Sequence, residues 1–113
     1  MPTYNRADTI RRSIASVQAQ TDPDWELVLV DDGSKDETPD VVAELARLDS
    51  RIRYFRQNNE GVGGARNHAL RESRGTQIAF LDSDDEWLPH HLELSGNFFR
   101  AFPSEHVFTS ELW

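Results

Sequence analysis

Apolar residues recur along the chain with two spacings, one typical of helices and one typical of buried strands. Helical spacing predicts four helices, at about residues 9–20, 38–48, 65–75 and 90–102. Short apolar runs predict strands at residues 25–30, 51–56, 78–81 and 107–109. Asp8 or Thr9 is expected to cap the first helix, and a glycine-rich loop is expected at residues 57–64.

This alternation predicts an α/β fold with three layers, α/β/α, around a mostly parallel sheet. Three polar clusters follow predicted strands, namely Tyr4-Asn5, Asp31-Asp32 and residues 82–85. Ligands of open α/β sheets bind at the carboxyl ends of the strands. The sequence therefore predicts a binding site at one edge of the sheet.

The start of the chain does not follow the same pattern. Thr3, Tyr4 and Asn5 are typical of a loop after a strand, yet only Met1 and Pro2 precede them. A mostly missing first strand would expose backbone donors and apolar helix faces. We expect a domain that is truncated at both ends. Either the chain pairs with another copy, as a homo-oligomer, or the sequence is part of a longer protein.

Composition excludes several classes. The 113 residues suit one small domain over residues 1–113, and a net charge of −8 gives no general attraction for nucleic acid. There is no cysteine, so neither disulfides nor thiolate metal sites arise. No apolar run reaches the roughly 20 residues that span a bilayer. We expect a cytoplasmic protein, with the inner face of a membrane as a further location.

Asp82-Ser83-Asp84-Asp85 places three carboxylates within four residues at the end of a predicted buried strand. Carboxylate oxygens suit Mg²⁺ or Mn²⁺, which complete their shells with water and phosphate oxygens. The alternative is a solvated turn whose aspartates cap the next helix.

Asp31-Asp32-Gly33-Ser34 follows another apolar run directly. A carboxylate held there can accept hydrogen bonds from a nucleobase or a ribose, and the glycine lets the chain turn beside a ligand. The alternative is a turn with a helix cap, which Asp and Ser also favour.

Four segments in order resemble the family 2 glycosyltransferases, which have the GT-A fold. They are Pro2 to Arg6 (PTYNR), Val30 to Asp36 (VDDGSKD), the stretch from Gly61 or Gly63 to Asn67, and Leu81 to Asp85 (LDSDD). The resemblance covers residues 2 to about 110. It implies the donor-binding part of an enzyme that moves a sugar from a nucleoside diphosphate sugar to an acceptor, with inversion.

The resemblance also implies individual roles. Pro2, Thr3 and Tyr4 would line the base pocket, and Asp32 would accept the base N–H. Asp82 would lie by the ribose or a metal-bound water, and Asp84 would coordinate the metal between the two phosphates. A UDP-sugar is the expected donor, and the acceptor is a saccharide, lipid or protein. Arg66 either positions the diphosphate or pairs with Asp82 or Asp84.

The resemblance identifies Asp82-Ser83-Asp84 as the D-x-D motif of the family. The family's general base lies well beyond this motif, so we expect it beyond residue 113. Two other functions remain open at this point. One is a module that binds a nucleotide sugar without catalysis. The other is a phospho-receiver domain, which needs a lysine at a later strand end, whereas Lys35 follows Asp31-Asp32 directly.

Overall fold

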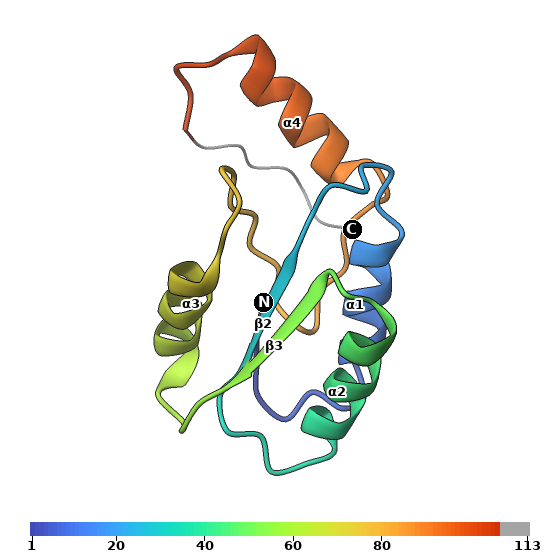
Figure 1. Cartoon of the computed structure of the whole chain (residues 1–113), viewed down its shortest axis with the longest axis vertical. Helices are drawn as coiled ribbons and strands as arrows, with labels where there is room; N and C mark the ends of the chain where they lie inside the picture. Colours follow the sequence, from blue (N-terminus) through green and yellow to red (C-terminus); the bar gives the residue numbers. More distant parts are fainter. Residues whose placement is uncertain (107–113) are drawn as a thin grey trace.

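The computed structural model describes residues 1–106 and places helices on both faces of a parallel sheet (Figure 1). The strands are β1 (Pro2–Thr3), β2 (Leu27–Asp31) and β3 (Ile52–Arg56). The helices are α1 (Ile10–Gln18), α2 (Thr38–Leu48), α3 (Gly61–Glu72) and α4 (His91–Ala101). The three-layer arrangement predicted from the sequence is confirmed: α1 and α2 cover one face, and α3 covers the other.

The sheet has the order β1-β2-β3, and both pairs of neighbours are parallel. Pro2 lies opposite Val30, and Leu27 lies opposite Ile52. Every residue of β2 is buried, as expected for a central strand covered on both faces. This arrangement places the residues that follow β1 and β2 at one edge of the sheet.

The predicted helices form where their apolar stripes can reach the core. Ile10, Ile14 and Val17 of α1 lie at helical spacing and are buried. Val42 is fully buried on α2, and Pro39 occupies the first turn, where its missing N–H leaves no hydrogen bond unmade. Thr9 flanks α1 as predicted, but its hydroxyl donates to the Ser83 carbonyl instead of capping the helix.

Two predictions of secondary structure are wrong: one strand does not form, and one helix begins earlier than expected. The segment 78–81 forms no strand, and Ile78 and Phe80 are 46% and 59% exposed. A strand needs a neighbour for its backbone hydrogen bonds, and β1 offers only two residues at the edge of the sheet. The helix expected from residue 65 begins at Gly61, inside the predicted glycine-rich loop. The predicted strand at 107–109 lies outside the described residues.

Within residues 1–106, no helix is both long enough and apolar enough to cross a membrane.

Candidate nucleotide-sugar site

A hollow of about 470 Å³ lies at the carboxyl edge of the sheet. This volume falls within the range of small-molecule sites. Its wall combines the loop after β1, the end of β2, the start of α3 and the acidic turn. The lining residues are Pro2, Thr3, Tyr4, Arg6, Asp32, Asn59, Gly61, Val62, Ala65, Asp82, Ser83 and Asp84. The hollow thus brings together segments that are far apart in the sequence.

Asp32 lines the hollow and is held rigidly. Its Oδ1 accepts hydrogen bonds from Gln57 Nε2 and from the Glu60 backbone N–H, each at 2.8 Å. Its Oδ2 accepts one from the Gly61 N–H at 2.9 Å. Asp32 therefore caps α3 across 28 to 29 residues of sequence, and this cap fixes the position of its carboxylate.

Two glycines allow this close approach. Gly33 has a φ of +82°, and a Cβ there would lie 3.3 Å from the Asn59 nitrogen. Gly64 has the Glu60 side chain over it, so that a Cβ would lie 2.8 Å from the Glu60 Cβ. A side chain at Gly33 would press on the backbone of the loop before α3, and one at Gly64 would displace the Glu60 side chain.

Asp31, the other acid of the pair, is fully buried and belongs to the framework. Its Oδ1 accepts from the Ser34 N–H at 2.8 Å, and its Oδ2 accepts from the Tyr54 hydroxyl at 2.9 Å. Burial, followed by the hydrogen bond to Asp31, raises the pKa of Tyr54 to about 12. Asp31 thus stabilises the turn that presents Asp32.

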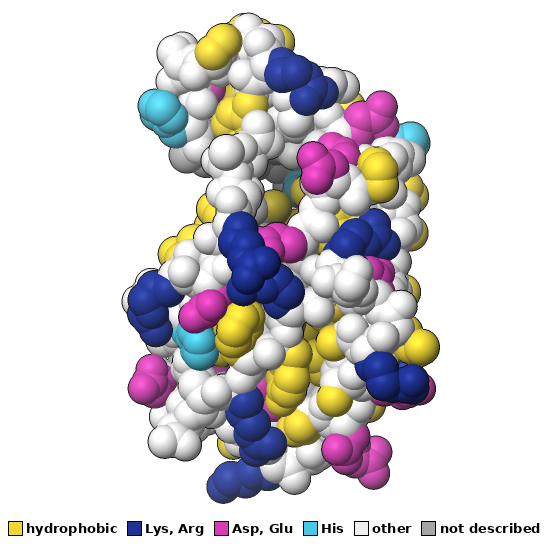
Figure 2. Space-filling view, in the orientation of Figure 1, with side chains coloured by type: hydrophobic (Ala, Val, Ile, Leu, Met, Phe, Trp, Pro, Cys, Tyr) yellow, Lys and Arg dark blue, Asp and Glu magenta, His cyan; other side chains and the backbone are white. Residues whose placement is uncertain are grey.

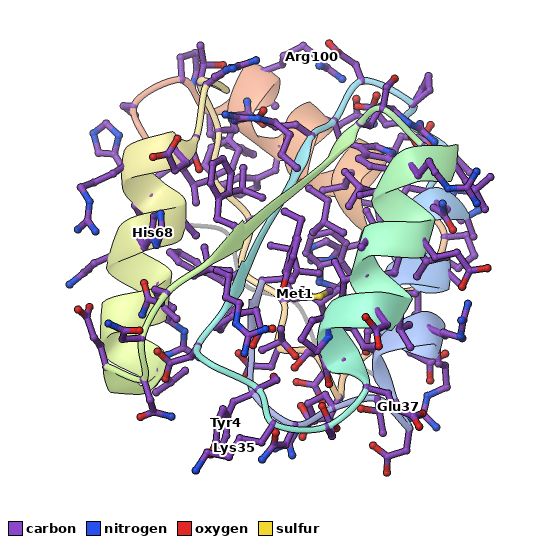
Figure 3. The ribbon with its side chains drawn as sticks, turned by 60° about the horizontal axis from the view of Figure 1, so that its bottom comes forward. Met1, Tyr4, Lys35, Glu37, His68 and Arg100 are labelled. Carbon is purple, nitrogen blue, oxygen red and sulfur yellow. The ribbon has the colours of Figure 1, made fainter. Side chains whose placement is uncertain are left out.

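The loop that carries Tyr4 is fastened to the turn after β2. The Asn5 N–H donates to Ser34 Oγ at 2.9 Å, and the Lys35 N–H donates to Asn5 Oδ1 at 2.8 Å. Asn5 has a φ of +51°, a conformation that asparagine tolerates better than most residues. Figure 3 accordingly shows Tyr4 and Lys35 at the same rim.

Each carboxylate of the D-x-D motif forms an ion pair with an arginine. Arg66 Nη2 lies 2.9 Å from Asp82 Oδ1, and Arg6 Nη2 lies 3.8 Å from Asp84 Oδ2. The side chains of Asp82 and Asp84 are 46% and 51% exposed. Ser83 between them is buried, which turns its two neighbours outward. Two exposed carboxylates therefore border the hollow, each next to a guanidinium.

Two buried polar atoms in this region have no hydrogen-bond partner among the described residues. They are Thr3 Oγ1, on the wall of the hollow, and Nε of Arg66. An unpaired buried polar atom costs free energy unless a further group satisfies it. A ligand that carries hydroxyl or phosphate oxygens would supply such a group.

The residues that sequence reasoning selected converge here. Pro2, Thr3, Tyr4, Asp32, Asp82 and Asp84 all line the hollow. Arg66 lies outside the lining but contacts Asp82, as one of its two predicted alternatives requires. Sequence reasoning gave no function to Arg6 or Gln57, although Arg6 belongs to the PTYNR segment. For Gln57, no local sequence signal exists, because its contact with Asp32 is long-range.

A divalent cation at the hollow would need oxygen ligands from the acidic side chains. Within residues 1–106, no group of three or more His, Asp or Glu side chains is arranged to hold a metal. Mg²⁺, however, is ordinarily bound through one or two carboxylates, with the remaining ligands from water and substrate phosphates. The exposed carboxylates of Asp82 and Asp84 fit that lower requirement.

A second hollow, of about 890 Å³, lies between α3, β2 and α4. Its lining mixes apolar side chains, such as Leu70, Ile78 and Phe80, with charged ones. The acidic residues among them are Asp22, Asp24 and Glu26. In Figure 2 it appears as a notch with hydrophobic side chains inside. Asp32, Asp82 and Asp84 do not line this second hollow, so the first hollow is the candidate site.

The model of the family described as Glycosyl transferase family 2 matches residues 1–108. The chain therefore belongs to this family of glycosyltransferases. It is 47% identical over 95 residues to the Escherichia coli protein named UDP-Glc:alpha-D-GlcNAc-diphosphoundecaprenol beta-1,3-glucosyltransferase WfgD. That match covers 83% of this chain and 37% of the relative. The chain spans between 14% and 37% of the length of these curated relatives.

Solved structures show the same fold. Residues 1–349 of S. aureus TarS, in complex with UDP-GlcNAc, match with a TM-score of 0.82 and 32% identity, over 88% of this chain and 30% of that one. The mannosyltransferase PcManGT of Pyrobaculum calidifontis, in complex with GDP-Man and Mn²⁺, matches with a TM-score of 0.71 and 31% identity. This match covers 76% of this chain and 26% of that one.

Proposed function

We propose that this chain supplies the donor-binding part of an enzyme that transfers a sugar from a nucleoside diphosphate sugar to an acceptor, with inversion. The observation that carries the proposal is the shared hollow. Tyr4 and Asp32 line the same hollow as Asp82 and Asp84, which gives a nucleotide both a place for its base and a place for its diphosphate.

The base end is built from Pro2, Thr3, Tyr4 and Asp32. Tyr4 offers an aromatic ring at the wall, and Asp32 offers an acceptor for a base N–H. The unpaired Thr3 hydroxyl offers a further hydrogen bond. Complexes of the relatives with UDP-GlcNAc and GDP-Man support nucleotide-sugar binding, and we propose a UDP-sugar as the donor.

The diphosphate end needs positive charge, because a nucleoside diphosphate leaves with developing negative charge. Asp82 and Asp84 would hold Mg²⁺ or Mn²⁺, which supplies this charge as a Lewis acid. A cation held by Asp82 and Asp84 would compete with Arg6 and Arg66, which pair with these two carboxylates in the free protein. The released guanidinium groups would then be available to the phosphates. The Mn²⁺ complex of PcManGT supports the use of a metal.

The other half of the reaction requires a general base that takes the acceptor's proton. We propose that this base lies beyond residue 113, in the part of the relatives that this chain does not span. The acceptor class is a saccharide, lipid or protein. The name of WfgD contains a lipid-linked acceptor, which supports a location at the inner face of a membrane.

The test is calorimetry of UDP binding to the full-length protein with and without Mn²⁺. Asp84→Asn should remove the Mn²⁺-dependent part of the affinity and leave the fold intact by circular dichroism. Asp85→Asn is the matched control, because Asp85 belongs to the same acidic turn but does not line the hollow. Equal losses in both variants would contradict the metal assignment.

Calorimetry alone does not distinguish an enzyme from a module that binds a nucleotide sugar without catalysis. Acceptor-dependent release of UDP from a UDP-sugar identifies an enzyme. UDP binding without release, across saccharide and lipid-linked acceptors, identifies a binding module.

A further inference from the structure

Asp32 has few acceptor positions left for a ligand. An ionised carboxylate offers about four lone pairs on two oxygens. Oδ1 already accepts two hydrogen bonds, from Gln57 Nε2 and the Glu60 N–H. Oδ2 accepts one, from the Gly61 N–H. One acceptor position therefore remains on the carboxylate, and it lies on Oδ2.

The side chain that completes this set is itself fixed. Gln57 Oε1 lies 2.8 Å from His68 Nδ1, and an amide oxygen can only accept. The Asp32 carboxylate can also only accept, so Gln57 presents Nε2 to Asp32 and Oε1 to His68, and His68 Nδ1 is the donor of that second contact. His68 in turn packs against the Phe55 ring, with centroids 5.6 Å apart. A row of hydrogen bonds thus links His68, which packs between α3 and β3, through Gln57 to Asp32 at the hollow.

We propose that Gln57, oriented by His68, limits Asp32 to a single acceptor and so selects a base that presents one N–H donor. This inference rests on the proposed function. Uracil and thymine present one ring N–H between two carbonyl groups. Guanine presents a ring N–H and an amino group side by side, and both oxygens of a carboxylate are needed to accept from them.

With Oδ1 saturated, one guanine donor would stay unpaired against Asp32. A site that leaves a ligand's polar group unpaired discriminates against that ligand strongly. The related structures hold UDP-GlcNAc in one case and GDP-Man in the other, so the shared fold leaves the base undetermined. Gln57 is a positioning residue for base specificity, since it acts on the ligand through Asp32.

The test compares UDP, GDP and inosine diphosphate (IDP) by calorimetry with Mn²⁺ on the full-length protein. Hypoxanthine, the base of IDP, has the same purine ring and ring N–H as guanine and lacks only the amino group, so IDP and GDP differ in that one donor. We expect the wild-type protein to bind UDP and IDP about fivefold or more tightly than GDP. GDP binding as tight as IDP binding would overturn the inference.

Gln57→Ala removes the second donor to Oδ1 and so frees one acceptor position on that oxygen. We expect the IDP-to-GDP preference to shrink by about fivefold in this variant. Gln18→Ala, on the exposed side of α1, is the matched control and should keep the wild-type ratio. A ratio unchanged by Gln57→Ala in a folded protein would overturn the inference. A purely structural loss would lower all three affinities together, and this would overturn it too.

The ligand-side comparison in the wild-type protein stands even if Gln57→Ala does not fold. If UDP and IDP bind no more tightly than GDP, the role of Gln57 is contradicted and the proposed function stands. Binding of none of the three nucleotides contradicts the proposed function itself, and this inference falls with it.

Discussion

The carboxylate of Asp32 joins the end of β2 to the first turn of α3, because its Oδ2 accepts a hydrogen bond from the Gly61 N–H at 2.9 Å. The negative charge also lies at the positive end of the α3 dipole. The same residue lines the hollow. One side chain therefore stabilises the wall of the site and remains available to a ligand.

This double use predicts that Asp32→Asn and Asp84→Asn differ in their effect on stability. In Asp32→Asn the new side-chain amide would present a donor to backbone N–H groups, and we expect the free energy of unfolding to fall by about 2 kcal/mol. Asp84 has only an exposed ion pair, so its loss should change that free energy by about 0.5 kcal/mol or less. Urea unfolding measures both values. Equal destabilisation would contradict the capping function of Asp32.

Gly33→Ala should destabilise the protein although it adds only a methyl group. The positive φ of Gly33 costs an alanine about 1–2 kcal/mol, and the contact with the Asn59 nitrogen adds to this. Gly63→Ala is the control, because nothing lies within 4 Å of its Cβ and alanine favours a helix by about 0.5–1 kcal/mol. Urea unfolding should therefore move in opposite directions for the two variants. A stabilising Gly33→Ala would exclude the conformational argument.

Local sequence patterns predicted most of the fold, because the residues of α1 and β2 that are buried in the core are the same ones that produce the helical and strand spacing in the sequence. Ile10, Ile14 and the buried run of β2 are examples. The segment 78–81 has the composition of a strand, but strand formation depends on a partner that local sequence does not describe. The prediction therefore failed where pairing, and not propensity, decides the structure.

The residues of the candidate site were predicted from the sequence, but most of the contacts between them were not. The order of the motifs placed Tyr4, Asp32 and Asp84 at one edge of the sheet, as parallel topology requires. The sequence could not show that Asp32 caps α3, since the two segments lie 28 to 29 residues apart. The same reason explains why Gln57 was missed. Contacts between loops that are distant in sequence form only after the sheet has brought them together.

Asp49 is expected to make the stability depend on acid pH. The hydrogen bond from Arg51, at 3.0–3.1 Å, is the main cause that lowers the pKa of Asp49 from 3.8 to about 2. Because the folded-state pKa lies below the unfolded value, ionisation favours folding. The contribution is complete above about pH 4 and is lost as the pH falls towards 2.

Asp49→Asn tests this pH dependence. It should lower the free energy of unfolding by about 1 kcal/mol at about pH 7. The difference from the wild-type protein should shrink as the pH falls from about 4 to about 2, as measured by thermal unfolding across that range. A difference that stays constant over the whole range would show that the Asp49 charge does not contribute.

Arg6 gives the sharpest test of how charge is shared in the hollow. Arg6 is the only basic side chain among the described residues that line it, and it lies 3.8 Å from an Asp84 oxygen. In the free protein it is paired with the carboxylate that the proposed metal needs, and in the proposed complex it would lie near the diphosphate. Arg6→Gln should therefore change two affinities in opposite directions. The affinity for Mn²⁺ alone should rise by about two- to fivefold, because an exposed pair is worth at most about 1 kcal/mol. The affinity for UDP without metal should fall by a similar factor, because a positive charge near the phosphates is lost.

Calorimetry at low ionic strength measures both affinities of Arg6→Gln, and added salt should reduce both effects. If both affinities fell together, Arg6 would be a structural residue, and Asp84 would not be shared between an arginine and a metal.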